Sequence, residues 1–202
     1  MWRGSAVEAG LDLWLFKRDL GAAQEAALVR FEQDAQGVAD EETDKERRNI
    51  APMLTAATGL PWPSEPPLAR QLKCEYWFDG IEVPLLMFID YEFSHILREL
   101  KTTKNMPSAV PDNHARQGAI YSTVKQRPLE FVYLTPKKAE IKPLVDTEKH
   151  LRMLGRYAHS VRAYLALTND KQDAAQIFPP NYDHYYYKSE KSKLAAQKIW
   201  AI

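Results

Sequence analysis

The chain has 202 residues, of which 45% are hydrophobic, a composition typical of a globular protein large enough to bury a full core. Lys plus Arg and Asp plus Glu each number 27, so the chain lacks the overall basic charge of many nucleic-acid-binding proteins, although a local basic groove is compatible with this balance. The single cysteine, Cys74, excludes an internal disulfide, an all-cysteine zinc site and a cysteine-bound iron–sulfur cluster within this chain.

No apolar run approaches the ~20 residues needed to cross a bilayer. The first residues, MWRGSAVEAGL, lack the basic region and apolar run of a secretory signal. Together with the lone cysteine, these features predict a cytoplasmic protein with no membrane partner.

The first part of the chain, residues 1–58, is predicted to be helical. Leu11, Trp14, Leu15 and Leu28 recur at roughly helical spacing, which predicts a helix over residues 5–33 with Ser5 as its N-cap. Residues 34–49 are densely charged and are expected to be solvated. Residues 59–70 contain four prolines and are predicted to form an extended connector.

A sheet is predicted in residues 71–145. Asp79-Gly80 separates two apolar runs and predicts a hairpin, because both residues tolerate positive φ. Ser94-His95 separates the second run from a third, which completes a three-stranded antiparallel meander. Residues 112–125 are predicted to form a helix capped by Asp112 or Asn113, and two further strands are predicted on either side of residues 136–138.

The last part, residues 146–202, is predicted to start with a long amphipathic helix at Asp146 and to end in another helix. We expect the tyrosine run at residues 185–187 to pack, with stacking on nucleic-acid bases as the alternative. The four parts are interpreted as a single domain, residues 1–202.

Two carboxylates interrupt the apolar runs around Ser94-His95. If a two-residue turn joins these strands, Phe93 pairs with Ile96 and Asp90 stands opposite Glu99. Such side chains lie ~5 Å apart at Cβ, and like charges there are destabilising. A divalent cation such as Mg²⁺ would remove this conflict. Strand alternation returns Lys101 to the same face, where an ammonium could neutralise charge developing on a phosphate.

A simpler interpretation of the same residues remains open. Glu99 and Lys101 could be solvent-facing residues of a half-exposed strand, with Asp90 at a strand end. Charged residues at alternating strand positions are common, so this spacing also arises by chance.

The predicted helix after the third strand carries a polar face. His114, Gln117 and Tyr121 recur at helical spacing, where an apolar stripe is usual, so this face needs a polar partner such as phosphate oxygens or metal-bound waters. The alternative is that Tyr121 packs while His114 and Gln117 are exposed.

Taken together, these motifs resemble the PD-(D/E)XK nuclease superfamily, in its RecB-like, phage-type exonuclease branch. That branch carries an acidic residue closing the second strand, then (D/E)-L-K-T, then a helix with Q-x-x-x-Y. The matching positions here are Asp90, residues 99–102 (ELKT), Gln117 and Tyr121. The C-terminal segment, from PPNYDHYYYK to AAQKIW, also resembles phage members, so the resemblance spans nearly the whole chain.

The resemblance implies an α/β fold, with a mixed, mainly antiparallel central sheet flanked by helices in a restriction-endonuclease-like core. It implies that Asp90, Glu99 and the Leu100 backbone carbonyl bind Mg²⁺ or Mn²⁺, with no iron–sulfur cluster. Lys101 would orient the attacking water, and Gln117 and Tyr121 would support Lys101 and the substrate.

Near the N-terminus, RGSAVEAGL resembles the first-helix motif of this branch, with Glu8 in place of a metal-binding His. Glu8 is therefore a candidate metal ligand that adds a negative charge. On local grounds it could instead complete a capping box with Ser5, in which Glu at the third helical position bonds the N-cap amide.

The implied activity is metal-dependent exonucleolytic hydrolysis of DNA, favouring a duplex with a free end, in phage-type recombination or repair inside a bacterial or phage-infected cell. A single-strand annealing protein is an implied partner. The candidate substrate-binding residues are Arg3, Lys104, His114 and Arg116. The alternatives are a non-cleaving DNA- or partner-binding protein on the same fold and a structure-specific endonuclease or resolvase.

Overall fold

The computed structural model describes residues 2–170, 173, 181–182, 187 and 189–200. The chain divides into two compact units, one formed by residues 1–77 and 83–152 and the other by residues 78–82 and 153–202. The first unit contains the whole sheet and every candidate site residue named above. The chain is thus of the predicted α/β class.

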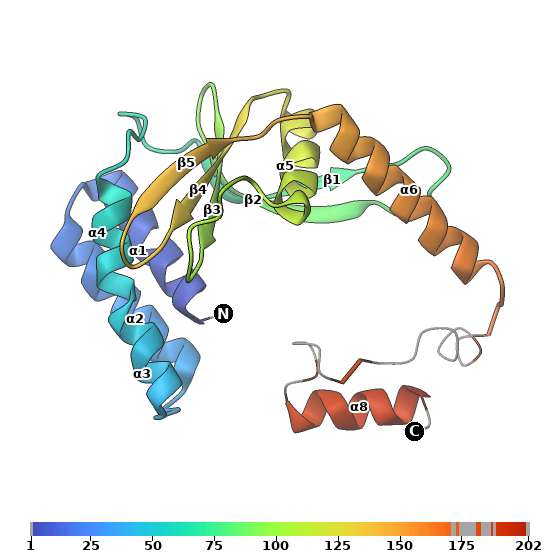
Figure 1. The fold of residues 1–202 in the computed structure, drawn as a ribbon, viewed down its shortest axis with the longest axis horizontal. Helices are drawn as coiled ribbons and strands as arrows, with labels where there is room; N and C mark the ends of the chain where they lie inside the picture. The colour runs from blue at the N-terminus through green and yellow to red at the C-terminus, as the bar shows by residue number, and fades with distance from the viewer. Residues whose placement is uncertain (1, 171–172, 174–180, 183–186, 188, 201–202) are drawn as a thin grey trace. The chain divides into compact units, whose positions relative to one another are not determined.

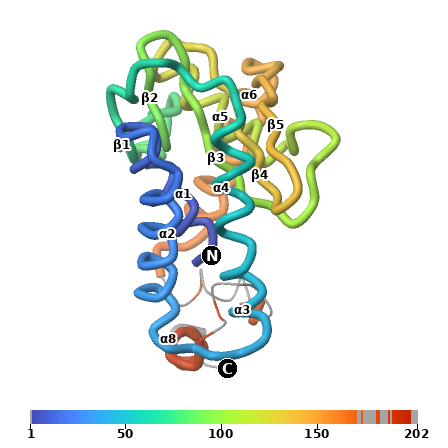
Figure 2. The backbone as a smooth tube through the Cα atoms, turned by 90° about the vertical axis from the view of Figure 1, so that its left-hand side faces the viewer, coloured from blue at the N-terminus to red at the C-terminus, as the bar shows by residue number. Residues whose placement is uncertain are grey.

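Four helices precede the sheet: α1 (Trp2–Lys17), α2 (Leu20–Ala35), α3 (Glu41–Arg48) and α4 (Ile50–Thr58). Small residues allow α1 and α2 to pack closely, since a Cβ added to Gly10 would lie 2.6 Å from the Ala23 carbonyl oxygen and 2.9 Å from the Ala27 Cβ. Figure 2 shows α1, α2 and α4 alongside one another.

The predicted single helix over residues 5–33 is wrong, because the chain breaks between α1 and α2. Arg18 adopts a left-handed φ of 56°, and the Asp19 carboxylate caps α2 by accepting from the Ala22 N–H at 3.0 Å. Helix α1 already starts at Trp2, so Ser5 lies inside it and is not an N-cap. The charged segment expected to be solvated includes α3, which Asp40 caps through the Thr43 N–H.

The sheet has five strands in the order β1-β2-β3-β4-β5 (Figure 1). They are β1 (Ala69–Tyr76), β2 (Leu85–Glu92), β3 (Leu97–Thr102), β4 (Leu129–Leu134) and β5 (Ala139–Pro143). All neighbouring pairs are antiparallel except β3 and β4, which α5 (Asp112–Lys125) connects as a parallel crossover. This confirms the predicted antiparallel meander, the helix over residues 112–125 and the mixed sheet. The N-cap of α5 is Pro111 rather than Asp112 or Asn113.

The loop that connects the two strands of the first hairpin is longer than predicted. Asp79-Gly80 does form a turn, in which the Ile81 N–H donates to the Phe78 carbonyl at 3.0 Å, but strand pairing ends at Tyr76 and Leu85. The next pair in this register would include Pro84, which has no N–H to donate to the ladder.

Both faces of the sheet are covered within the first unit. Tyr91, Phe93, Val132 and Leu134 pack with residues of α1, α2 and α4 on one face. On the other, Tyr121 of α5 packs with residues of β1 to β4, among them Ile89, Leu97, Phe131 and Tyr133. The central part of the sheet is therefore a rigid support between two cores, and the candidate site lies on it.

After the sheet, α6 spans Thr147–Leu165, close to the predicted start at Asp146, and α8 spans Glu190–Trp200. Tyr185 and Tyr186 of the predicted packing run lie outside the described residues. Within the described part of the chain, no helix combines the length and apolar character needed to cross a membrane.

Candidate active site

The site forms where β2 and β3 separate. The Phe93 N–H donates to the Ile96 carbonyl at 2.9 Å across the Ser94-His95 turn, and Glu92 pairs with Leu97. The predicted turn and register are thereby confirmed. Pairing ends one step later, at Tyr91 and Arg98, so Asp90 and Glu99 stand where the next pair would have been.

The Asp90 carboxylate enters the gap between the two strands. Its Oδ2 accepts the Leu100 N–H at 2.8 Å, in the place of a backbone carbonyl of the ladder. On the other side of β3, the Leu97 N–H donates to Pro128 and the Thr103 N–H to Leu134, so odd-numbered residues face β4. In a parallel ladder this turns the Leu100 N–H and C=O toward β2. The Leu100 carbonyl and Asp90 thus lie on the same side of β3.

Lys101 is held by two oxygen atoms. Its Nζ donates to Glu99 Oε1 at 2.8 Å and to Gln117 Oε1 at 2.8 Å. Gln117 Nε2 in turn donates to the Tyr121 hydroxyl at 2.7 Å, and that hydroxyl donates to the Phe88 carbonyl at 2.7 Å. This chain of bonds runs from α5 to β2 and fixes the position of the ammonium over β3.

Gln71 of β1 lies between two of the acids. Its Nε2 donates to Asp90 Oδ1 at 2.8 Å and also to Glu8 Oε1, so one amide joins α1 to β2. Gln71 has a left-handed φ of 45°, which is uncommon for a residue with a side chain. Since Arg70 pairs with Tyr91 and Leu72 with Ile89, this irregular residue stands opposite Asp90.

The sequence-based interpretation missed Gln71, and it also missed Asp12. Asp12 follows Glu8 by four residues on α1, so helical spacing alone could have suggested it. Its Oδ2 pairs with Arg70 NH1 at 3.1 Å, and burial raises its pKa. Gln71 gives no comparable signal, because its place depends on the pairing of β1 with β2.

The three site carboxyls hold their protons unusually well. Burial, followed by the charge of Asp90, raises the pKa of Glu99 to about 8. Burial raises the pKa of Asp90 as well, against the opposing effects of the Leu100 N–H bond and the Lys101 charge. The pKa of Glu8 rises to about 7, again through burial and then the Asp90 charge. Crowded buried carboxylates of this kind favour either a proton or a cation.

The donor set fits a divalent cation. Glu99 is 2% exposed, and its Oε2 is buried without a hydrogen-bond partner among the described residues, so this oxygen is available to a cation once the carboxyl is ionised. Carboxylate and carbonyl oxygens are the ligands that Mg²⁺ and Mn²⁺ prefer. Within the described residues, no three His, Cys, Asp or Glu side chains already surround one point. The Gln71 amide instead lies between Glu8 and Asp90.

Glu8 does not act in a capping box, since α1 starts at Trp2 and Glu8 lies well inside the helix. Its side chain contacts Gln71. The structure thus places this predicted ligand beside Asp90.

The four predicted substrate-binding residues are placed differently. His114 lies on the α5 side of the sheet, with its Nδ1 2.8 Å from the Tyr133 hydroxyl, and burial followed by the Lys101 charge lowers its pKa to about 4. It is therefore a neutral side chain at physiological pH. The NH1 atom of Arg116 lies 3.8 Å from the Asp112 Oδ2. Arg3 and Lys104 line a separate pocket, and both approach Glu46.

Comparison of the chain with protein-family models, curated proteins and solved structures found no match.

Proposed function

We propose that this chain is a metal-dependent deoxyribonuclease with a PD-(D/E)XK-type centre on a restriction-endonuclease-like core, and that it acts as an exonuclease. One observation carries the proposal: Asp90 enters the gap between β2 and β3 beside Glu99, whose other neighbour is the ammonium of Lys101. A buried acid pair can hold a divalent cation and a fixed amine beside it can stabilise charge on a phosphate, so this arrangement suits phosphodiester hydrolysis.

Asp90, Glu99 and the Leu100 carbonyl would hold Mg²⁺ or Mn²⁺, with Glu8 assisting. Such a cation supplies Lewis acidity and neutralises charge on the phosphate. Gln71 has to release Glu8 and Asp90 for this, because its amide now bonds both.

Lys101 supplies the positive charge that the protein itself brings to the reaction. In hydrolysis, the water oxygen bonds to phosphorus and gives up a proton, one P–O ester bond breaks, and the leaving alkoxide takes up a proton to become a hydroxyl group. Negative charge grows on the phosphate oxygens, and a fixed ammonium stabilises that charge without reorganising. Gln117 and Tyr121 keep Lys101 in place through the bonds described above.

The proposal is tested by incubating the purified protein and Mn²⁺ with linear duplex DNA. We expect digestion by the native chain and a ~100- to 1000-fold lower rate for Lys101→Ala, the range found when one charge-stabilising donor is removed. Lys17→Ala, which alters an exposed lysine at the end of α1, is the matched control and should leave the rate unchanged.

Closed circular DNA separates the exonuclease from an endonuclease on the same fold. An exonuclease leaves the closed circle intact while it degrades the linear form. Cutting of both forms would replace the exonuclease assignment with an endonuclease assignment. A native chain that binds DNA without cleaving either form would refute the nuclease function.

A further inference from the structure

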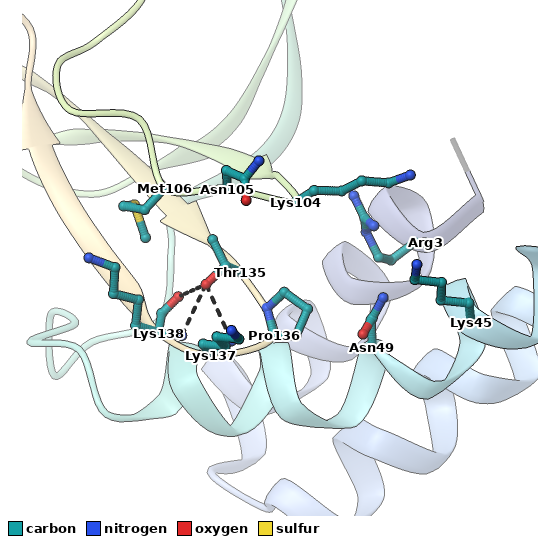
Figure 3. A pocket seen from close by; sticks show the side chains of 10 residues that line it. All are labelled: Arg3, Lys45, Asn49, Lys104, Asn105, Met106, Thr135, Pro136, Lys137 and Lys138. Carbon is teal, nitrogen blue, oxygen red and sulfur yellow. Dashed lines mark hydrogen bonds between the residues drawn. The ribbon is translucent and has the colours of Figure 1, made fainter.

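A second site, lined by several basic side chains, lies beyond the C-terminal ends of β3 and β4. It is a pocket of about 480 Å³ formed by α1, α3, the segment after β3 and the β4–β5 turn (Figure 3). In Figure 3 the ends of the Arg3, Lys45, Asn49 and Lys104 side chains gather on one side, and Lys137 lies on the turn opposite. Among the described residues that line it, none has an acidic or aromatic side chain.

The positive charges of this pocket are only partly neutralised, and the Lys138 ammonium pairs with Glu140 at 2.6 Å. Within the described residues, neither Lys45 nor Lys137 has an acidic group within 4.0 Å, and the Lys104 ammonium lies 4.0 Å from Glu46. Arg3 pairs with Glu46 through NH1 at 2.5 Å, yet its buried Nε has no hydrogen-bond partner in the described part of the chain. A cluster of like charges is unfavourable by itself, so this pocket favours an anion.

Two supports hold the pocket in shape. The Arg3 side chain is only 11% exposed, and α1 rests on the end of β3, since a Cβ added to Gly4 would contact the Thr102 hydroxyl at 3.4 Å. On the other side, the Thr135 hydroxyl accepts the Lys138 N–H at 3.0 Å and donates to the Lys138 carbonyl at 2.9 Å. The turn that carries Lys137 is therefore closed by its own bonds.

The pocket lies close to the candidate active site along two elements. Lys104 follows Lys101 by three residues and lies just beyond the end of β3, at most ~10 Å along the chain. Arg3 precedes Glu8 by five residues, ~7.5 Å along the axis of α1. Since one DNA strand advances 3.4 Å per nucleotide along the duplex axis, both separations correspond to about two or three nucleotides.

We propose that this pocket binds phosphate groups of a DNA strand a few nucleotides from the bond at the Asp90–Lys101 centre. Its basic lining suits phosphate oxygens, and contacts to phosphate position a strand without reading its sequence. The position relative to the cleavage point rests on the nuclease function proposed above, whereas the binding itself can be measured without cleavage.

The test compares two double variants with the same change in charge. Lys45→Ala with Lys137→Ala removes the two unpaired pocket lysines, and Lys17→Ala with Lys149→Ala removes two exposed lysines elsewhere. Binding to fluorescent duplex DNA is followed by anisotropy in EDTA, over a range of salt concentrations. We expect at least tenfold weaker binding for the pocket variant alone. Its slope of log K against log salt should be smaller by about two, because each phosphate contact contributes ~0.9.

The DNA ends identify which phosphates bind. The same titrations are made with 5′-phosphorylated, 3′-phosphorylated and unphosphorylated linear duplexes and with a closed circle. A deficit confined to one phosphorylated end assigns the pocket to a terminal phosphate, and an equal deficit on all four DNAs assigns it to internal phosphates. Equal affinity of the pocket and control variants on every DNA would overturn the proposal.

These outcomes are independent of the nuclease test. If DNA binding depends on the pocket but Mn²⁺ produces no digestion, the proposed nuclease function is refuted and the proposed phosphate-binding pocket stands. If DNA is digested but its binding does not depend on the pocket, the nuclease function is supported and the pocket proposal is refuted. Circular dichroism of both double variants shows that neither set of substitutions alters the fold.

Discussion

Gln71 combines an uncommon backbone conformation with a central place among the acids. Its left-handed φ aims a single amide nitrogen at both Glu8 and Asp90. Backbone strain of this kind persists only where surrounding structure enforces it, and it is frequent at functional sites. We infer that Gln71 separates the two acids while no cation lies between them.

Gln71→Ala should therefore weaken the metal-free protein and increase its response to metal. Loss of two hydrogen bonds to carboxylates at an exposed side chain should cost about 1–2 kcal/mol of unfolding free energy. The Tm increase caused by Mn²⁺ should exceed that of the native chain, because no amide has to leave. Thermal denaturation with and without Mn²⁺ measures both effects.

Gln126→Ala is the matched control, since Gln126 is an exposed glutamine with a φ of 50° at the end of α5. Both substitutions retain a Cβ, so the backbone strain is the same before and after each change. An equal Mn²⁺ response in the two variants would contradict the role assigned to Gln71.

The raised carboxyl pKa values make stability depend on pH in an unusual direction. The unfolded chain releases the Glu99 and Glu8 protons near pH 4.5, whereas the folded chain keeps them up to about pH 8 and 7 respectively. In this interval the folded state binds more protons, so the unfolding free energy falls as pH rises.

We predict that the metal-free native protein is less stable to urea at pH 8 than at roughly pH 5.5, and that Glu99→Gln reduces this difference. A neutral amide in place of Glu99 cannot ionise, and it also removes the charge that faces Asp90. Urea titrations of both proteins at the two pH values provide the measurement. An unchanged difference in Glu99→Gln would show that Glu99 does not hold its proton in the folded state.

At the scale of elements, Gly10 sets the distance between α1 and its neighbours. A Cβ there would lie 2.6 Å from the Ala23 carbonyl oxygen and 2.8 Å from Leu54 Cδ1. The carbonyl belongs to the α2 backbone and cannot move alone. Helix α1 would have to shift, and it carries both Glu8 and Arg3.

Gly10→Ala should destabilise the protein by about 1–3 kcal/mol, the usual cost of overpacking, although alanine is the better helix former. It should also lower the proposed nuclease activity, because Glu8 moves with α1. Gly21→Ala, in the first turn of α2, is the control, since a Cβ there would meet Asp19 Oδ1 at an ordinary 3.5 Å. Denaturant unfolding measures the unfolding free energy of each variant. Similar values for Gly10→Ala and Gly21→Ala would exclude close packing at Gly10.

Element prediction succeeded where the sequence carries local signals and failed where tertiary structure decides. Residues 112–125 were predicted as a helix and the Ser94-His95 turn fixed the β2–β3 register, and both agree with the structure. The break at Arg18 was missed, because neither glycine nor proline marks it and the apolar spacing continues across it. The parallel pairing of β3 with β4 likewise depends on how α5 crosses the sheet.

At the scale of the whole molecule, the balanced net charge conceals local separation. Equal numbers of acidic and basic residues are arranged so that carboxylates gather at the β2–β3 gap and cations gather at the pocket beyond it. Both clusters lie in the first compact unit. Composition alone could not predict this, since it records the sum of the charges and not their positions.

Part of the candidate site could be predicted from local spacing, and part could not. Strand alternation placed Glu99 and Lys101 on one face, and helical spacing placed Gln117 and Tyr121 on one stripe that reaches Lys101. Gln71 could not be found in this way, because its contacts join three elements that are remote in the sequence.

Asp90 accepts the Leu100 N–H that a backbone carbonyl would otherwise bond, so one side chain both shapes the strand gap and supplies a candidate metal ligand. Changing it would alter the scaffold along with the chemistry. If the proposed nuclease is to be trapped on intact DNA for crystallisation, Lys101→Ala is therefore the better choice: it removes the amine and leaves the backbone bonds of β2 and β3 in place.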